Sequence, residues 1–262
     1  MDLGLRGRVA LVAGGSKGLG LAIAEELAAE GASVAIVARG RDAIDAACER
    51  IRRAGGRAHG VAADVSDAQA IARAVDDVRT ALGPADILVT NSGGPRSGTF
   101  DALSADDWDA AHRLLLTNAV TFTRTVLPEM RARKWGRILT ITSIAAKQPV
   151  DGLILSNSLR AAVAGFARTL ANEVAADGVT VNNLLPGYTR TDRVVDLSTQ
   201  MASAERTTID AVVGRWETQI PMRRLGEPRE FAALAAFLAS ERASYITGQS
   251  IAVDGGWIRT VF

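Results

Sequence analysis

VALVAGGSKGLGLAIAEEL, residues 9–27, joins an apolar run to an amphipathic segment through a turn that holds Gly14, Gly18 and Gly20. Glycine lets the backbone turn sharply and approach a ligand closely, and the following helix would offer free N–H groups and the positive end of its dipole. This G-x-x-x-G-x-G spacing is typical of a dinucleotide site, although an ordinary glycine-rich turn is the alternative. We expect cofactor contacts from Gly14, Ser16, Lys17, Gly18, Leu19 and Gly20.

Short apolar runs recur along the rest of the chain. With the first, they lie at residues 9–13, 33–38, 58–63, 86–90, 137–142, 179–185 and 250–254. Helix-like segments separate them, and several of these end in glycine, as helices often do. Alternation of strand and helix predicts a parallel sheet with helices on both faces. The predicted fold is a single-domain α/β Rossmann fold, a doubly wound parallel sheet of about seven strands.

The composition fits one large core. The chain has 262 residues, of which 48% are apolar and 23% charged, and α/β folds of this length are often one domain. No linker, charge block or short repeat divides residues 1–262. The segment from about 190 to 227 is more polar and less regular, and we expect it to be an insertion that forms a substrate lid.

Charge and cysteine usage narrow the expected partners. Thirty basic and twenty-nine acidic residues give a net charge of +1, so we expect small molecules or further copies of the chain, and neither nucleic acid nor a membrane. The single cysteine, Cys48, fits a reducing compartment, and no metal-ligand spacing occurs. The N-terminus lacks a secretory signal pattern, and the apolar run at 231–240 is too short to span a bilayer. We expect a cytoplasmic protein without a metal.

Positive charge follows the second apolar run. Arg39 and Arg41 stand where a fold selective for NAD has an acidic residue that binds the ribose 2′-hydroxyl. A guanidinium can instead bind a 2′-phosphate, and Lys17 adds a second charge to the same region. The pattern favours NADP(H) over NAD(H), although Arg41 fits equally well as a solvated residue at a helix start.

Over essentially its whole length, the sequence resembles the short-chain dehydrogenase/reductase family, and within it the group similar to 3-oxoacyl-carrier-protein reductase. The matching motifs are AGGSKGLG (13–20), ADVSD (63–67), NSGG (91–94), Asn118 in LLLTNAV, GRILTITSIAA (136–146), LLPGYTRT (184–191), RLGEPREFAALAAFLAS (224–240) and YITGQSIAVDGG (245–256). The resemblance implies hydride transfer between nicotinamide and a carbonyl or alcohol carbon, in a homodimer or homotetramer.

The resemblance also implies where the cofactor lies. It gives Asp64 and Val65 a role at the adenine ring and the turn at 91–94 a role at the adenosine ribose, with the segment 186–191 at the nicotinamide. The residues concerned are Asp64, Val65, Asn91, Ser92, Gly93, Pro186, Gly187 and Thr191. Plainer alternatives are that Asp64 caps the following helix and that the 91–94 turn needs its glycines for conformation.

The resemblance implies four catalytic roles, and two of them have the expected residues, Ser143 and Asn118. Thirteen residues after Ser143, where the family has a tyrosine, stands Ser156, and Arg160 replaces the lysine four residues later. The following AAVAG (161–165) fits the family's helix without a shift, and residues 1–187 contain no tyrosine. We therefore interpret Ser156 and Arg160 as replacements for the catalytic pair.

The two replacements differ in consequence. Arg160 keeps a positive charge for the nicotinamide ribose. Ser156 is a weaker acid than tyrosine and is shorter, so a water would bridge it to a substrate oxygen, and a helix-start role is an equal alternative. Tyr188 is another possible proton donor, with packing as its ordinary role. The favoured hypothesis is an NADP(H)-dependent reductase or dehydrogenase with an atypical proton relay. A cofactor-binding sensor, regulator or scaffold is the alternative, and other chemistry on a related ligand is a weaker one.

Overall fold

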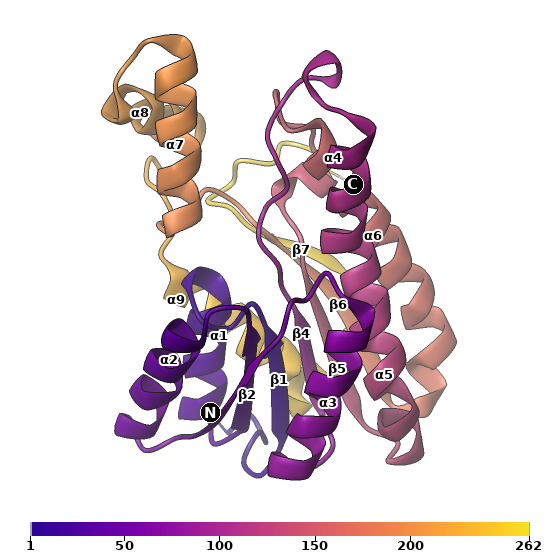
Figure 1. Ribbon diagram of the computed structural model, residues 1–262. Helices are drawn as coiled ribbons and strands as arrows, with labels where there is room; N and C mark the ends of the chain where they lie inside the picture. Colours follow the sequence, from indigo (N-terminus) through magenta and orange to yellow (C-terminus); the bar gives the residue numbers. More distant parts are fainter. Residues whose placement is uncertain (1, 262) are drawn as a thin grey trace.

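The computed structural model describes residues 2–261, in which seven parallel strands form one sheet in the order β3-β2-β1-β4-β5-β6-β7 (Figure 1). The strands are β1 (Val9–Ala13), β2 (Ser33–Ala38), β3 (Arg57–Ala62), β4 (Ile87–Thr90), β5 (Gly136–Ile141), β6 (Val179–Pro186) and β7 (Ser250–Val253). This confirms the predicted Rossmann-type fold. The strand order reverses between β1 and β4, and such a reversal opens a crevice at the carboxyl edge of the sheet.

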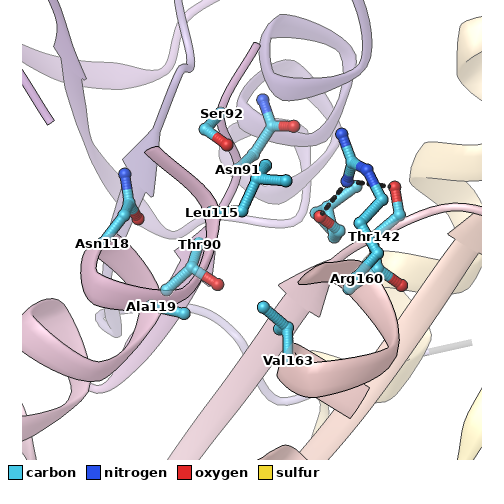
Figure 2. A pocket seen from close by; sticks show the side chains of 10 residues that line it. Thr90, Asn91, Ser92, Leu115, Asn118, Ala119, Thr142, Arg160 and Val163 are labelled. Atoms are coloured by element: carbon cyan, nitrogen blue, oxygen red, sulfur yellow. Dashed lines mark hydrogen bonds between the residues drawn. The ribbon is translucent and has the colours of Figure 1, made fainter. Parts of the chain in front are cut away.

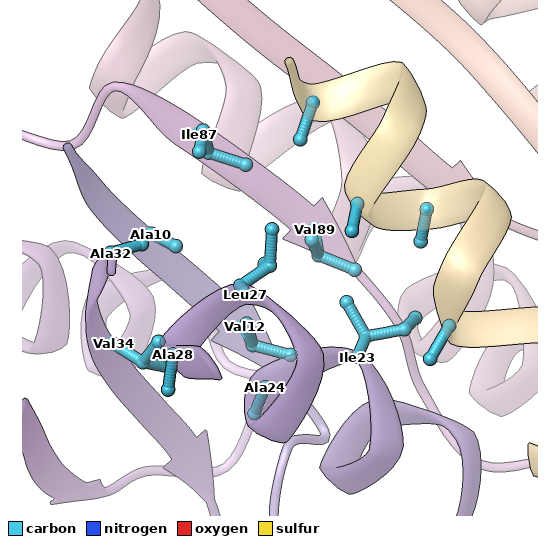
Figure 3. Packing of buried hydrophobic residues seen from close by; sticks show 14 of the residues in the cluster. Ala10, Val12, Ile23, Ala24, Leu27, Ala28, Ala32, Val34, Ile87 and Val89 are labelled. Atoms are coloured by element: carbon cyan, nitrogen blue, oxygen red, sulfur yellow. The ribbon is translucent and has the colours of Figure 1, made fainter. Parts of the chain in front are cut away.

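Helices cover both faces of the sheet. One face carries α1 (Gly18–Ala29), α2 (Arg41–Arg53) and α9 (Pro228–Ala239), and the other carries α3 (Ala68–Leu82), α5 (Asn118–Ala132) and α6 (Ile154–Val174). Figure 3 shows Ile23 and Leu27 of α1 packed over Val12 and Val89 of the central strands. Because these four side chains are fully buried, the start of α1 is fixed next to the carboxyl end of β1.

The segment from about 190 to 227 forms two helices, α7 (Asp192–Glu205) and α8 (Ile209–Gln219), which stand beyond the carboxyl edge of the sheet (Figure 1). They enclose a small core of their own, in which Val212 and Trp216 are buried. The sequence pattern of this segment is less regular because its core is only a narrow apolar stripe on otherwise polar helices. The segment lies between β6 and α9.

A π-helical turn interrupts the long helical segment after β4. Helix α4 (Ala105–His112) runs into the π-helix η2 (Arg113–Thr117), and α5 begins at Asn118. A π-turn shifts the register of a helix and is frequent at functional sites. Four single 3-10 turns complete the described elements: η1 (Phe100–Ala102), η3 (Ile144–Ala146), η4 (Ala175–Asp177) and η5 (Glu241–Ala243).

Candidate active site

The glycine turn has the shape that its sequence predicts. Gly14 and Gly18 have φ angles of +60° and +53°, in the left-handed region that favours glycine. A Cβ on Gly20 would collide with the carbonyl oxygen of Gly14 and lie 2.8 Å from the side-chain nitrogen of Asn91. That Asn91 nitrogen donates to the Gly14 carbonyl at 3.2 Å. The end of β4 therefore holds the turn after β1 in place.

The first turn of α1 is open to an anion. Lys17 occupies the N-cap position, no side chain caps the helix, and the first turn contains no acidic residue. Thr191, at the N-cap of α7, lies against this turn, since a Cβ on Gly18 would be 3.5 Å from its methyl carbon. Uncapped N–H groups and the helix dipole are what a pyrophosphate needs. The turn fits a dinucleotide.

Arg39 and Asp64 follow β2 and β3 at the same edge of the sheet. Arg39 is exposed and has no hydrogen bond to any of residues 2–261, whereas Arg41 donates to the Gly60 carbonyl at 3.3 Å. The Ser66 N–H and hydroxyl hold the pKa of Asp64 below its usual range, with a smaller contribution from the charge of Arg39. The residue that caps α3 is Asp67, not Asp64. A capping role for Asp64 was therefore a wrong alternative.

Ser143 follows β5, and a single hydrogen bond orients its hydroxyl group. Its Oγ accepts a hydrogen bond from the Ala145 N–H at 3.1 Å. The hydroxyl proton has no acceptor among the described residues. It is therefore free to donate to a ligand oxygen in the crevice.

Ser156 and Arg160 lie one turn apart in α6, buried to relative exposures of 8% and 9%. The Nε of Arg160 donates to the Ser156 Oγ at 3.1 Å, and its Nη1 donates to the carbonyl oxygens of Ile141, at 3.2 Å, and Thr142. The structure therefore ties Arg160 to the end of β5, next to Ser143, which the sequence alone did not indicate. Burial, and then the charge of Arg193, lowers the pKa of Arg160 to about 10.

Asn118 and Arg160 face each other across a small pocket at the carboxyl ends of β4 and β5 (Figure 2). The Asn118 amide, 2% exposed, donates to the Val65 carbonyl at 3.0 Å. The pocket volume of about 10 Å³ is close to the space that one water molecule requires. Asn118 thus lines the pocket from the side opposite Arg160 and is not bonded to either serine.

Tyr188 belongs to the core of the α7–α8 pair. Its ring stacks on Trp216 with centroids 4.5 Å apart and meets the edge of Trp257 at 6.2 Å. Burial raises the pKa of Tyr188 to about 12. Both observations favour the packing role over proton donation.

Arg193 is a residue of the crevice that the sequence analysis did not single out. It leaves the first turn of α7, and its Nη2 donates to the Pro95 carbonyl at 3.4 Å. A Cβ on Gly94 would lie 2.6 Å from that nitrogen, so the guanidinium rests directly on the main chain of the loop after β4. The only sequence signal was a cation two residues after Thr191.

The structure brings most of the predicted site residues to one edge of the sheet. The glycine turn, Asn91 and Thr191 meet at the start of α1, and Arg160 meets Ser156 at the end of β5. Gly187 is also closely packed, because a Cβ there would lie 2.7 Å from Asp254.

Within residues 2–261, no three His, Cys, Asp or Glu side chains gather as a metal site requires. Burial raises the pKa of the Cys48 thiol, which suits an inert core residue. Among these residues no helix has the length and apolar character to cross a bilayer.

A parallel sheet whose order reverses beside an uncapped glycine turn defines a Rossmann-type fold. Within that class, the chain belongs to the short-chain dehydrogenase/reductase family. The family model described as enoyl-(acyl carrier protein) reductase matches residues 13–258.

Within this family, the chain is similar to several individual reductases. The chain is 35% identical to the 3-oxoacyl-acyl-carrier-protein reductase FabG of Aquifex aeolicus over 98% of this chain and 99% of the relative. It is 38% identical to the acetoacetyl-CoA reductase of Shinella zoogloeoides over 95% of this chain and 98% of the relative. Among solved structures, L-sorbose reductase from Gluconobacter frateurii, complexed with NADPH and L-sorbose, matches with a TM-score of 0.94 and 35% identity, with both chains covered completely. The relatives are oxidoreductases that act on small molecules.

Proposed function

We propose that this protein is an NADP(H)-dependent oxidoreductase that interconverts a carbonyl and an alcohol, and that Ser156 and Arg160 take the place of the family's tyrosine and lysine. The observation that carries the proposal is the hydrogen bond from the Arg160 Nε to the Ser156 Oγ, made in a buried position next to Ser143. Reductase relatives, one of them solved with NADPH, support the same reaction class.

The residues present fit the dinucleotide. Close backbone approach at Gly14 and Gly20 and the uncapped start of α1 suit a pyrophosphate. Arg39 has a guanidinium free to bind a 2′-phosphate, which supports NADP(H) over NAD(H). The remaining contacts would come from Asp64, Val65, Asn91, Ser92, Gly93, Pro186, Gly187 and Thr191. NADPH, when bound, supplies the hydride that reduces the carbonyl carbon.

Both serines are prepared to donate. The Ser143 Oγ accepts from a backbone N–H and the Ser156 Oγ accepts from Arg160, so neither hydroxyl proton has an acceptor within residues 2–261. Two donors that converge on one substrate oxygen would polarise the carbonyl. Ser143 then stabilises the developing negative charge, and Ser156 delivers the proton, directly or through a water.

Arg160 would replace the proton that Ser156 gives up. As the O–H bond of Ser156 breaks toward the substrate, the Nε–H of Arg160 moves to the Ser156 oxygen, so no free alkoxide accumulates. The pKa of Arg160, lowered to about 10, makes this guanidinium a better proton donor than an ordinary arginine. The neutral guanidine regains its proton from water on the pocket side, where Asn118 lines the opposite wall.

The lid and the assembly follow as further parts of the proposal. We infer that α7 and α8 close over the substrate, because their own small core lets them move as a unit. The homodimer or homotetramer and the cytoplasmic location expected from the sequence stay predictions.

The test is carbonyl-dependent oxidation of NADPH across a panel of activated ketones and 3-oxoacyl thioesters. We expect slow turnover by the wild type and faster turnover by the variant Ser156→Tyr/Arg160→Lys. A circular dichroism melt and an NADPH titration show that the double variant is folded and binds cofactor. Tight NADPH binding without any turnover would favour the alternative, a cofactor-binding sensor or scaffold.

A further inference from the structure

The crevice contains two arginines without a carboxylate partner. Among the described residues, neither Arg160 nor Arg193 has a carboxylate within ion-pair distance. Three other cations around the lid are paired: Arg190 with Glu227 at 3.1 Å and Arg224 with Glu230 at 2.6 Å, and Arg215 with Glu205. Arg206, at the far end of α7, makes no ion pair among the described residues. Arg160 and Arg193 therefore leave unpaired positive charge on the crevice side of α7.

Arg160 offers a donor to that space. Its Nε and Nη1 hold Ser156 and the end of β5, but none of the hydrogen bonds among the described residues uses its Nη2. Figure 2 shows the outer nitrogen pointing away from its bonded partners, toward the end of the pocket at which Asn91 and Ser92 lie. A guanidinium that is nine-tenths buried thus keeps one NH₂ group for a ligand.

Arg193 approaches the same space from α7. Two residues of the β4–α4 loop, Gly94 and Pro95, support its guanidinium, and that loop then reaches Gly98, whose N–H donates to the Gly152 carbonyl at 2.7 Å. Gly152 lies just before α6, the helix of Ser156. Arg193 therefore rests on a loop that is hydrogen-bonded to the segment just before α6. Its charge acts on Arg160, since it contributes to lowering the pKa of that group.

The start of α7 adds to the positive electrostatic potential in the crevice. Thr191 is its N-cap, makes no side-chain cap and lies against Gly18 of the glycine turn, so this 14-residue helix begins at the crevice end of the lid. Asp192 places one carboxylate in its first turn. A cation in the first turn of a helix opposes the helix dipole. Asp192 offsets the dipole of the helix start but makes no ion pair with Arg193, so an anionic ligand would compensate Arg193.

We propose that the substrate of this site carries a carboxylate and that Arg193 binds it while the reacting oxygen lies at Ser143 and Ser156. The proposal rests on the proposed function for the reacting group and adds the class of substrate, a short oxo or hydroxy acid. Arginine is suited to this role because its planar fork binds a carboxylate through two parallel hydrogen bonds.

The cofactor pyrophosphate is the competing anion. Thr191 and Asn91 contact the glycine turn, whereas the Arg193 guanidinium rests on Gly94 and Pro95, just past Gly93, the last residue of this loop named as a cofactor contact. We therefore favour the substrate, and the parallel NADPH titration below separates the two anions. An arginine that bound the pyrophosphate would be expected against the glycine turn itself.

The test measures binding to the full chain saturated with NADP⁺. Probes are short straight-chain 2- and 3-hydroxy acids and the matching neutral amides, and calorimetry gives the ratio of the amide Kd to the acid Kd. Arg193→Met removes the guanidinium and keeps a flexible side chain. Arg206→Met removes the same charge from the far end of α7 and is the matched control. NADPH alone is titrated in parallel.

We expect the wild type and R206M to prefer at least one acid over its amide by about ten- to hundredfold, the value of one or two charge-assisted hydrogen bonds. R193M should lose at least tenfold of this preference while its NADPH affinity stays within about twofold of the wild type. No acid preference in the wild type would overturn the proposal, as would a preference that R193M retains while its NADPH binding weakens. Since the readout is binding, an acid preference without turnover would contradict the proposed oxidoreductase function and leave the anion site standing.

Discussion

Replacing Ser156 by alanine removes one oxygen atom at the point where the proton relay meets the substrate. In the wild type that oxygen accepts from the Nε of Arg160 at 3.1 Å, and both side chains are at least nine-tenths buried. The hydroxyl is the only donor of α6 that we place at the substrate oxygen. Positioned general acids contribute about 10²–10⁴-fold to a rate, so we expect kcat to fall by that factor. NADPH affinity should change by less than about threefold, because Ser156 is not among the expected cofactor contacts.

The same substitution has a structural cost that must be separated from the chemical one. It leaves the Arg160 Nε without its acceptor in a buried place, which costs about 1–3 kcal/mol of unfolding free energy. For a chain of this size, that amounts to a decrease in melting temperature of roughly 2–10 °C. The variant should therefore remain folded at the assay temperature.

The assay is NADPH oxidation at saturating cofactor, together with a thermal melt and an NADPH titration. Ser156→Thr is the matched control, because it keeps a hydroxyl at the same position and should retain most of the activity. If S156A kept kcat within about threefold of the wild type, Ser156 would not be the proton donor and the relay through Arg160 would be refuted.

Three further expectations follow from the same site. Reduction requires the protonated guanidinium of Arg160, whose pKa is about 10, so kcat for reduction should fall as pH rises through about 10. The variant R193M removes one cause of the lowered pKa and should move this fall in kcat to higher pH. A kcat profile that stays flat to pH 11 would contradict the role of Arg160. Tyr188→Phe should keep kcat within about threefold of the wild type, because the ring packs on Trp216 and burial raises the phenol pKa to about 12. A tenfold loss of kcat in steady-state kinetics would make Tyr188 the proton donor. Arg39→Asp should weaken NADPH binding by about ten- to hundredfold and leave NADH binding equal or stronger. Cofactor fluorescence measures both affinities. Equal losses for both cofactors would show that Arg39 does not bind the 2′-phosphate.

The sheet could be predicted from the sequence because each strand is a nearly continuous apolar run between turn residues. Predicted and observed strand bounds agree within one residue, as at 58–63 against Arg57–Ala62 and at 250–254 against Ser250–Val253. The helices of the lid were not predicted, because their apolar residues are few and pack mainly on one another. Local periodicity is strong where a segment covers the main core and weak where it forms a satellite.

The glycine turn was predictable for a steric reason, while the orientation of the arginines was not. Gly14 and Gly20 must be glycine because of contacts within the turn and with Asn91. The partners of Arg160, by contrast, include the main chain of β5, 18 and 19 residues away. The contact of Arg193 with Pro95 spans 98 residues. Such contacts depend on the assembled fold, and no spacing within the sequence indicates them.

The central claim is that this crevice transfers hydride to a carbonyl without a catalytic tyrosine, and isotope transfer tests it most directly. The wild-type chain is incubated with NADPH carrying deuterium at C4 of the nicotinamide ring and with the carbonyl panel, and the products are analysed by mass spectrometry. We expect an alcohol with one deuterium on the former carbonyl carbon, formed in proportion to NADP⁺ and strongly reduced in S156A. Saturable NADPH binding with no deuterated alcohol from any carbonyl would contradict the claim.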